Sequence, residues 1–579
     1  MDCLNVLELQ ERKIDFDVPN EGAKARLTLV SDNKCDRPRL ALIAFRAIVK
    51  GQIHLVDGKA HVKVSKHGKF SFSIPCHTVA IEVEVIASNS YECFAKLRGY
   101  FPPLYKVDFT SNSTSVRLTI KHCNTLTVDT SGLDHSPVLP GEDRIGGHQL
   151  GPGRSSRAMA IVHLAMFEAM NAIIKTHKSH VGLVSNEKQG RNGKPSVEAA
   201  IYQATHDTLV WLYPSHRPRL GLDKEEIMSQ LLRGSQSHVE KEKKWVKKGI
   251  VVGKKAAAAV IALRTDDGSS LPEPTIGVDY FPSDAPGEWR MDPISQIPKA
   301  IGANWSKVTP FIIGTADKYR CPPPPALDSA EYAAAFNEVK ALGGDGVTTT
   351  TVRSAEQTFI GVFYAYDGMP SLCAPPRLYN QIARTIADTK GLDSVELLYM
   401  LALINVAMAD AAIACWDSKY HHKFWRPVTA IREADQGTGP SGLGDGNAAT
   451  VGDETWTPLG APASNLTNGI NFTPPFCAYP SGHSTFMPAV GQILRHILGT
   501  DEVSFTFVSD EYNGKTGDAQ GNVRPLHPRH FSRISQVEDE NGDSRIFLGI
   551  HFKFDKTAGA VMGHAVADEV FEKLFQKLE

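Results

Sequence analysis

The spacing of apolar residues changes character along the chain. Before about residue 122, short stretches such as Ala60–Ser65 and Val79–Ile86 alternate between apolar and polar residues, and turn signals such as Asp57-Gly58 separate them. Such alternation is typical of half-buried β-strands that are joined by tight turns. We therefore predict a small all-β domain, sandwich-like and antiparallel, over residues 1–122.

Beyond residue 154 the apolar residues recur with the period of α-helices, which predicts a mainly α domain, a helical bundle, over residues 154–579. The intervening residues 123–153 are predicted to form a linker or loop. Residues 266–325 and 434–475 are rich in Pro and Gly and predict long loops over the bundle. The predicted helices are Arg157–Ile174, Ser196–Leu212, Gly253–Leu263, Tyr332–Leu342, Ala355–Tyr366, Arg377–Thr389, Val395–Lys419, Ser484–Leu498 and Thr557–Leu578.

Composition is that of a soluble globular protein. The 579 residues include 62 Lys and Arg against 64 Asp and Glu, a balance that offers no field for nucleic acid or an acidic membrane. The longest apolar run, Leu397–Trp416, contains Asn405 and Asp410, which favours a buried helix over a membrane span. No apolar segment follows Met1, and the nine cysteines form no CxxC pairs. We expect no secretion signal, zinc site or disulfide framework and, by default, a cytoplasmic location.

Three polar blocks carry candidate chemistry, and the first is Lys419-Tyr-His-His-Lys-Phe-Trp-Arg426-Pro427. Lys419 and Arg426 are seven residues apart, which is close to two turns of a helix. On one helix their long side chains would share a face and converge on a small anion. Pro427 would then end or kink the helix. Taken alone, two such cations are more often part of a solvated surface.

The second block is Pro480-Ser481-Gly482-His483, which leads directly into the predicted helix Ser484–Leu498. Free backbone N–H groups and the helix dipole favour an anion at such a helix start. Gly482 lets the backbone approach closely, Ser481 adds a hydroxyl donor, and His483 can exchange a proton near neutral pH. An ordinary helix cap beside a core histidine is the alternative interpretation.

The third block is Ser544-Arg545-Ile-Phe-Leu-Gly549-Ile-His551. Arg545 offers a planar fork of donors to an oxyanion. On a continuous helix Arg545 and His551 would diverge, so we expect Gly549 to break the helix between them. A lone histidine before a helix is more often structural than functional.

In this order the three blocks together resemble the signature of the superfamily that holds type 2 phosphatidic acid phosphatases, bacterial acid phosphatases and vanadium haloperoxidases. From about residue 150 onward, further stretches are similar to the vanadium haloperoxidases in particular. These stretches are Pro474–His483, Ala365-Tyr-Asp367-Gly with Pro375–Gln381, Leu459–Asn465, Ser509–Gly514 and Ser544–Asp555. The resemblance implies the helical-bundle fold of that superfamily and a vanadate cofactor, with phosphate able to occupy the same site.

The resemblance also implies a role for each residue of the blocks. His551 would be the metal ligand, and one nitrogen of its imidazole would be the only protein atom bonded to vanadium. His483 would take a proton from hydrogen peroxide, and Asp367 would pair with Arg545. The vanadate oxygens would meet Lys419, Arg426, Ser481, Gly482, His483 and Arg545, and Lys419 would further polarise the oxygen that is transferred. Trp416 and Phe476 match aromatic positions of a halide pocket.

The implied reaction is the oxidation of a halide by hydrogen peroxide to hypohalous acid, which halogenates a small organic acceptor. Bromide is the easier substrate, and the aromatic Trp416 and Phe476 are chloroperoxidase-like. The alternative is an acid phosphatase or phosphotransferase with a phosphohistidine at His551 and with His483 as the acid. A third alternative is a non-catalytic binding protein, which the intact Lys, Arg and His positions disfavour. Homo-oligomerisation is left open.

Overall fold

The computed structural model describes residues 112–138, 142, 144–183, 195–233, 239–367, 374–466 and 469–578 and, before them, the strands β1–β7. The chain divides into two compact units, Met1–Asp108 and Phe109–Glu579.

The strands of the first unit pair into two antiparallel sheets. One sheet has the order β2-β1-β5 and the other β3-β4-β7-β6. The predicted strand at residues 60–65 falls on β4, and the one at residues 79–86 falls on β5 and β6. A sandwich of the two sheets remains a prediction. The strands are β1 Lys24–Asp32, β2 Arg39–Ile43, β3 Gly51–Val56, β4 Lys59–Val64, β5 Ala80–Glu84, β6 Ile86–Ala87 and β7 Glu92–Ala95.

The second unit is mainly α-helical, as predicted. Its helices are α1 Asn112–His135, α2 Pro152–Ile174, α3 Val197–Leu212, α4 Arg217–Arg233, α5 Val239–Arg264, α6 Ala330–Leu342, α7 Ala355–Phe363, α8 Pro375–Lys390, α9 Ser394–His422, α10 Pro427–Arg432, α11 His483–Leu498, α12 Ile534–Phe547 and α13 Lys553–Lys573. One short antiparallel hairpin joins β8 Glu502–Phe507 to β9 Arg529–Arg533. Short 3₁₀ turns lie at Pro214–His216, Trp305–Lys307, Ala316–Tyr319 and Asp510–Tyr512.

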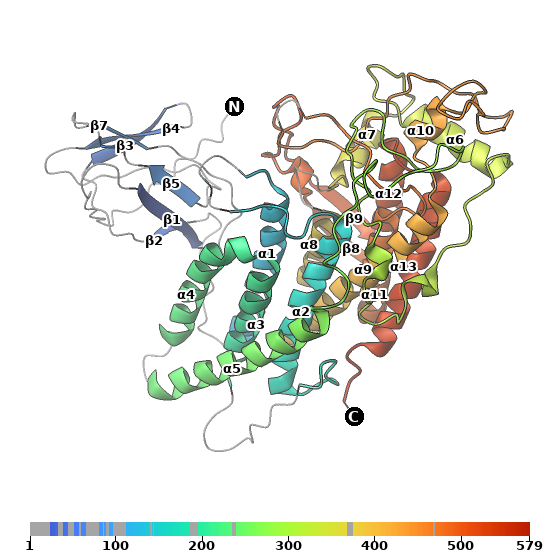
Figure 1. The fold of residues 1–579 in the computed structure, drawn as a ribbon. Coiled ribbons are helices and arrows are strands. Elements are labelled where there is room, and N and C mark those ends of the chain that lie inside the picture. Colours follow the sequence, from blue (N-terminus) through green and yellow to red (C-terminus); the bar gives the residue numbers. More distant parts are fainter. Residues whose placement is uncertain are drawn as a thin grey trace. The chain divides into compact units, whose positions relative to one another are not determined.

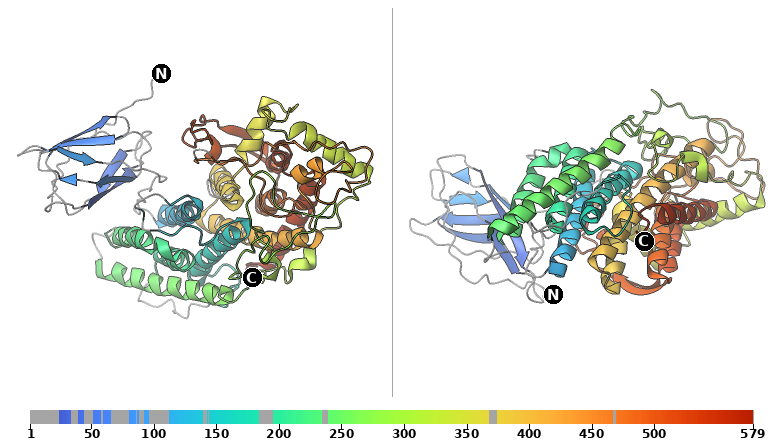
Figure 2. Two further views of the ribbon diagram at one scale, coloured as in Figure 1. Left: turned by 45° about the horizontal axis from the view of Figure 1, so that its top comes forward. Right: turned by 90° about the horizontal axis from the view of Figure 1, so that it is seen from below.

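The helices form two groups that lie side by side. In the first, α2 packs against α3 and α5; in the second, α11 packs against α9, α12 and α13. Contact between α2 and α9 joins the two groups (Figure 1). Both views in Figure 2 show the blue-to-green group of α1–α5 beside the yellow-to-red group of later helices. The residues of the three blocks lie on or next to helices of the second group.

Helix α9 is the central core helix of the second group. It begins at a capping box in which the Asp393 side chain accepts from the N–H of Glu396, and that of Glu396 accepts from the N–H of Asp393. Its one mid-helix carboxylate, Asp410, accepts backbone N–H bonds from Phe311, Ile312 and Ile313 at 2.6–3.1 Å. A polar residue can therefore lie in the middle of this apolar helix because its hydrogen bonds are satisfied.

Two helices, α2 and α9, are long and apolar enough to cross a membrane by length and composition. Of their apolar windows, 89% and 94% respectively are buried inside the bundle. Both therefore pack as core helices of the second unit, which agrees with the sequence interpretation of Leu397–Trp416.

Helices α1, α4, α10 and α12 and the β8–β9 pair were not predicted from the sequence, and Pro427 begins α10 instead of ending a helix. Helix α1 spans the boundary that was predicted at residue 122 and enters the predicted linker, whereas the first compact unit ends at Asp108. The apolar period of α1 is faint because polar side chains lie on its buried face. Thr127 and Thr130, for example, donate to the carbonyls of Cys123 and Leu126 one turn earlier, at 2.7 and 2.6 Å.

We predict that a chain starting at Phe109 folds, whereas a chain starting at Val128 is strongly destabilised. The second truncation removes Ile120, Cys123 and Leu126, which are 0–4% exposed in the core. Loss of that burial should lower the free energy of unfolding by about 5 kcal/mol or more. Denaturant titration of both truncations against the full chain measures this. Equal midpoints for the two truncations would show that α1 does not belong to the core.

Candidate active site

The first block is split by the end of helix α9. Lys419 lies on the last turn of α9, and Lys423 closes that helix in a left-handed conformation, with φ 49°. Arg426 follows in extended chain, immediately before α10. The expected single helix face is therefore wrong. The turn at Lys423 nevertheless keeps both side chains buried near the same point, at 0% and 1% exposure.

The second block forms the start of α11, as predicted. Gly482 precedes the helix with an ordinary φ of −62°, so its backbone alone does not require glycine. A Cβ at Gly482 would instead lie 3.2 Å from Cη2 of Trp416, which is tighter than usual. The small residue therefore allows the indole to lie against the helix start.

The third block is broken at Gly549, as predicted. Arg545 lies on the last turn of α12, and Gly549 adopts φ 74°, where a Cβ would lie 2.5 Å from the Gly343 carbonyl oxygen. The chain reverses there and places His551 just before α13. Arg545 and His551 thus line one pocket instead of diverging.

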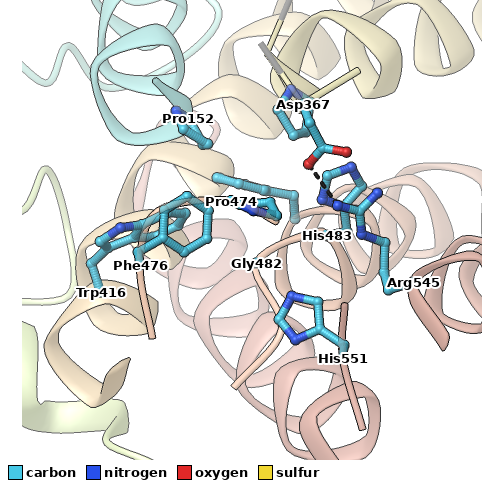
Figure 3. Close-up of a pocket in the computed structure, with 11 residues that line it drawn as sticks. Pro152, Asp367, Trp416, Pro474, Phe476, Gly482, His483, Arg545 and His551 are labelled. Carbon is cyan, nitrogen blue, oxygen red and sulfur yellow. Dashed lines mark hydrogen bonds and ion pairs between the residues drawn. The ribbon is translucent and has the colours of Figure 1, made fainter. Parts of the chain in front are cut away.

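That pocket brings most of the predicted site together (Figure 3). Trp416 and Phe476 form one side of it, Arg545 lies on the other side, and His551 closes the end between them. Lys419, Arg426 and Ser481 are buried behind the lining. The lining residues are Pro152, Asp367, Pro375, Trp416, Pro474, Phe476, Gly482, His483, Phe486, Arg545 and His551.

The ammonium group of Lys419 is fully used by backbone carbonyls. Nζ donates to the oxygens of Cys477, Ala478 and Pro480 at 2.8, 2.9 and 2.5 Å. Three donors meet three acceptors, so the lysine ties the segment before Ser481 to α9. Burial lowers the pKa of Lys419 to about 8. Direct contact between Lys419 and an oxyanion stays a prediction, because it needs one of these bonds to be exchanged.

Arg426 fixes the tautomer of His551. Its Nη1 donates to Nε2 of His551 at 2.9 Å, and because a guanidinium cannot accept, Nε2 must carry the lone pair. The proton therefore lies on Nδ1, which donates to Asp555 Oδ2 at 2.8 Å. Burial and then the neighbouring Arg426 hold the pKa of His551 well below its usual value, so the ring is neutral. Burial raises the pKa of Asp555 to about 7.

Arg545 pairs with Asp367, and this ion pair does not use all of the hydrogen-bond donors of the guanidinium. Nη2 of Arg545 lies 2.6 Å from Oδ1 of Asp367, which is the contact implied for these two residues. Among the described residues, the buried Nε and Nη1 of Arg545 have no hydrogen-bond partner, and neither has Oδ2 of Asp367. Buried donors without partners are costly, so these two N–H groups indicate the place of an acceptor such as an oxyanion.

His483 is held as a neutral base. Its Nε2 donates to the carbonyl oxygens of Ala365 and Tyr364 at 2.9 and 3.1 Å. Carbonyls only accept, so Nε2 carries the proton and Nδ1 carries the lone pair. Burial and then Arg545 hold the pKa of His483 well below its usual value. The ring can therefore accept a proton at Nδ1.

The side of the pocket across from Arg545 is aromatic, with cations behind it. The ring centres of Trp416 and Phe476 are 5.1 Å apart, and Phe486 lies 6.2 Å from Trp416. Lys419 Nζ lies 5.2 Å and Arg426 Cζ 4.9 Å from the centre of the Phe476 ring. An apolar wall backed by positive charge is suited to a poorly hydrated anion.

Several residues of the site were missed from the sequence. Asp555 has a signal that could have been used, because it follows His551 by four residues, one helical turn. Phe486 follows His483 by three residues in the same way. The carbonyls of Tyr364 and Ala365 have no side-chain signal, since any residue offers a carbonyl oxygen.

Comparisons with known proteins find one family model and several similar chains. The profile of the VCPO second helical-bundle domain matches residues 399–579. A vanadium chloroperoxidase from Curvularia inaequalis is 30% identical over 492 residues, which cover 72% of this chain and 76% of that protein. The fold is similar to that of a bacterial vanadium-dependent iodoperoxidase, with a TM-score of 0.60, 23% identity, and 78% of this chain and 96% of that chain covered. It is also similar to a holo-type bacterial vanadium-dependent chloroperoxidase, with a TM-score of 0.53, 16% identity, and 73% and 92% covered.

We predict that Asp555→Ala weakens binding of vanadate or phosphate by about 10- to 100-fold, the usual effect of removing a carboxylate that orients a metal-binding histidine. Without Asp555, the Nδ1 N–H of His551 loses its acceptor, and the orientation of the ring is held only by Arg426 at Nε2. Isothermal titration with each anion measures the loss. The Asp555→Asn variant keeps an oxygen acceptor, so its affinity for each anion should fall by a smaller factor. Equal affinities of wild type and Asp555→Ala would exclude this orienting role.

Proposed function

The chain belongs to the vanadium haloperoxidase family, and from this premise we propose that it oxidises bromide and chloride with hydrogen peroxide, using vanadate held between Arg545 and His551. The product would be hypohalous acid, which halogenates small organic acceptors. The main support for this proposal is the hydrogen bonding of Arg545. Two buried N–H groups of Arg545 find no partner in the part of the chain that the structure describes, and Arg545 lines the same pocket as the unprotonated Nε2 of His551.

The residues of the pocket fit vanadate by the chemistry of their donors. His551 offers Nε2 to the metal, and Arg545 offers Nε and Nη1 to the oxygens. Arg426 would turn its Nη1 from His551 to an oxygen, and the backbone N–H of Gly482 and the hydroxyl of Ser481 lie at the start of α11. When bound, vanadate supplies a Lewis acid that activates hydrogen peroxide toward halide without changing its own oxidation state.

His483 is proposed to be the base of the reaction. Its Nε2 proton is committed to two carbonyls, and its low pKa leaves Nδ1 free to take a proton from hydrogen peroxide. Asp367 keeps the fork of Arg545 in one orientation through the 2.6 Å ion pair. Lys419 contributes its charge from behind Phe476 and holds the segment that leads to Ser481.

Trp416 and Phe476 are proposed to form the halide pocket. Their rings, tilted by 58° to each other, exclude water from one side of the site, and Lys419 and Arg426 lie behind them. A desolvated halide next to buried positive charge is a better nucleophile than a hydrated one. The likeness to a vanadium chloroperoxidase supports chloride as a substrate, and bromide, which is easier to oxidise, should then react as well.

The proposal is tested by two assays on one preparation. Halogenation of monochlorodimedone should require vanadate, hydrogen peroxide and bromide or chloride together. Hydrolysis of p-nitrophenyl phosphate without vanadate tests the phosphatase alternative, in which His551 would be the nucleophile. Vigorous phosphate hydrolysis with no halogenation would overturn the proposal in favour of that alternative.

We predict that His483→Ala slows halogenation far more than it weakens vanadate binding. General acid–base groups contribute roughly 10²- to 10⁴-fold in rate, whereas His551, Arg545 and Arg426 remain to hold the anion. Turnover with bromide and with chloride should be compared with the vanadate dissociation constant. The rate of chloride oxidation, which is the harder reaction, should fall by a larger factor than the rate of bromide oxidation. Parallel losses of rate and affinity would show that His483 only binds the anion.

A further inference from the structure

The indole of Trp416 is confined between two glycines, one at each end of the ring. At the far end of the ring, Cη2 would lie 3.2 Å from a Cβ placed on Gly482. At the near end, a Cβ on Gly302 would lie 2.1 Å from Cδ1 and 2.3 Å from Nε1. No side chain fits at Gly302 unless the indole or the backbone moves.

The backbone around Gly302 is itself anchored. Trp416 Nε1 and the Tyr420 hydroxyl both donate to the Ile301 carbonyl, at 3.1 and 2.9 Å. The N–H of Ile301 donates to the Pro475 carbonyl at 3.0 Å, next to Phe476. The same short segment is thus bonded to the Trp416 indole and to the backbone immediately before Phe476.

A carboxylate holds Gly302 from outside the pocket. The N–H of Gly302 donates to Glu273 Oε2 at 2.5 Å, and Glu273 Oε1 forms a 3.3 Å ion pair with Arg154 Nε. Arg154 lies in the first turn of α2, two residues after Pro152, which lines the pocket. Residues 273 and 302 therefore link the long loop of residues 266–325 to the pocket rim.

We propose that Gly302 is a positioning residue that sets the place of the Trp416 ring and thereby the size limit of the halide pocket. This rests on the proposed function and adds to it a determinant of halide preference. With the Ile301 carbonyl and Glu273 holding the backbone, a side chain at position 302 displaces the indole toward Gly482 and Phe476. The halide pocket then narrows. Among iodide, bromide and chloride, the value of kcat/KM should fall most for iodide, because it is the largest.

The test compares two alanine variants in the same loop. Gly302 and Gly277 have nearly equal φ values of 78° and 83°, so alanine is strained at both positions, but a Cβ on Gly277 meets nothing within 4 Å. Values of kcat/KM for iodide, bromide and chloride are measured for wild type, Gly302→Ala and Gly277→Ala at saturating vanadate. The iodide-to-chloride ratio should fall about tenfold or more in Gly302→Ala, since one carbon in a tight pocket is worth roughly 10- to 200-fold. It should not change in Gly277→Ala. Equal ratios in all three proteins would overturn the proposal.

A second measurement is independent of turnover. Iodide quenching of the Trp416 fluorescence, taken as the difference between wild type and Trp416→Phe without vanadate, should weaken in Gly302→Ala. If wild type oxidises no halide but this quenching changes, the proposed function fails while the positioning role stands. If wild type is active and neither the ratio nor the quenching changes, the positioning role fails alone.

A double variant separates contact with the indole from general strain. In a Trp416→Ala background both contacting atoms, Cδ1 and Nε1, are absent, so Gly302→Ala should no longer shift the halide ratio. A shift of the same size in that background would overturn the proposal.

If Gly302→Ala does not fold, Glu273→Gln takes its place. The Glu273→Gln change weakens the hydrogen bond to the Gly302 N–H, so the backbone at Gly302 confines the Trp416 indole less tightly. The iodide-to-chloride ratio of kcat/KM should then rise. An unchanged ratio in Glu273→Gln would then overturn the proposal.

Discussion

The structure depends on positive charge that is buried inside the helical bundle. Lys419, Arg426 and Arg545 are 0–1% exposed, and burying such groups is costly unless they are paired and hydrogen-bonded. Asp367 pairs with Arg545, yet two buried N–H groups of that guanidinium have no partner among the residues described by the structure. Burial, and then these charges, hold the pKa values of His483 and His551 low, so both rings are neutral. An oxyanion would complete this arrangement, because it would accept the spare hydrogen bonds and neutralise the charge.

The fold brings these groups together through helix ends rather than helix faces. Lys419 and Arg545 lie on the last turns of α9 and α12, and Gly482 and His551 lie immediately before α11 and α13. At helix ends the chain can turn, so residues six or seven positions apart converge on one point, whereas on a continuous helix Arg545 and His551 would diverge. Besides Asp367 and His483, the rest of the pocket wall is proline and aromatic side chains, which make much of the surroundings of the charges apolar. Fixed donors in an apolar pocket stabilise charge more strongly than the same donors in water.

The parts of the site that were predictable from the sequence are local in the chain. The three blocks, the break at Gly549 and the helix start after Gly482 depend on residues within a few positions of one another. The fixed tautomers of His551 and His483 depend on Arg426 and on the carbonyls of Tyr364 and Ala365, which are more than a hundred positions away and have no distinctive spacing. Helix α1 was missed for a related reason, since its buried Thr side chains are satisfied by its own backbone and obscure the apolar period.

The most direct test of the central claim is a crystal structure of the protein soaked with orthovanadate. We expect one vanadium atom bonded to Nε2 of His551, with its oxygens accepting hydrogen bonds from Nε and Nη1 of Arg545 and with Arg426 turned from the histidine to an oxygen. Vanadium bound elsewhere, or vanadate in the pocket with those two Arg545 donors still unpaired, would contradict it.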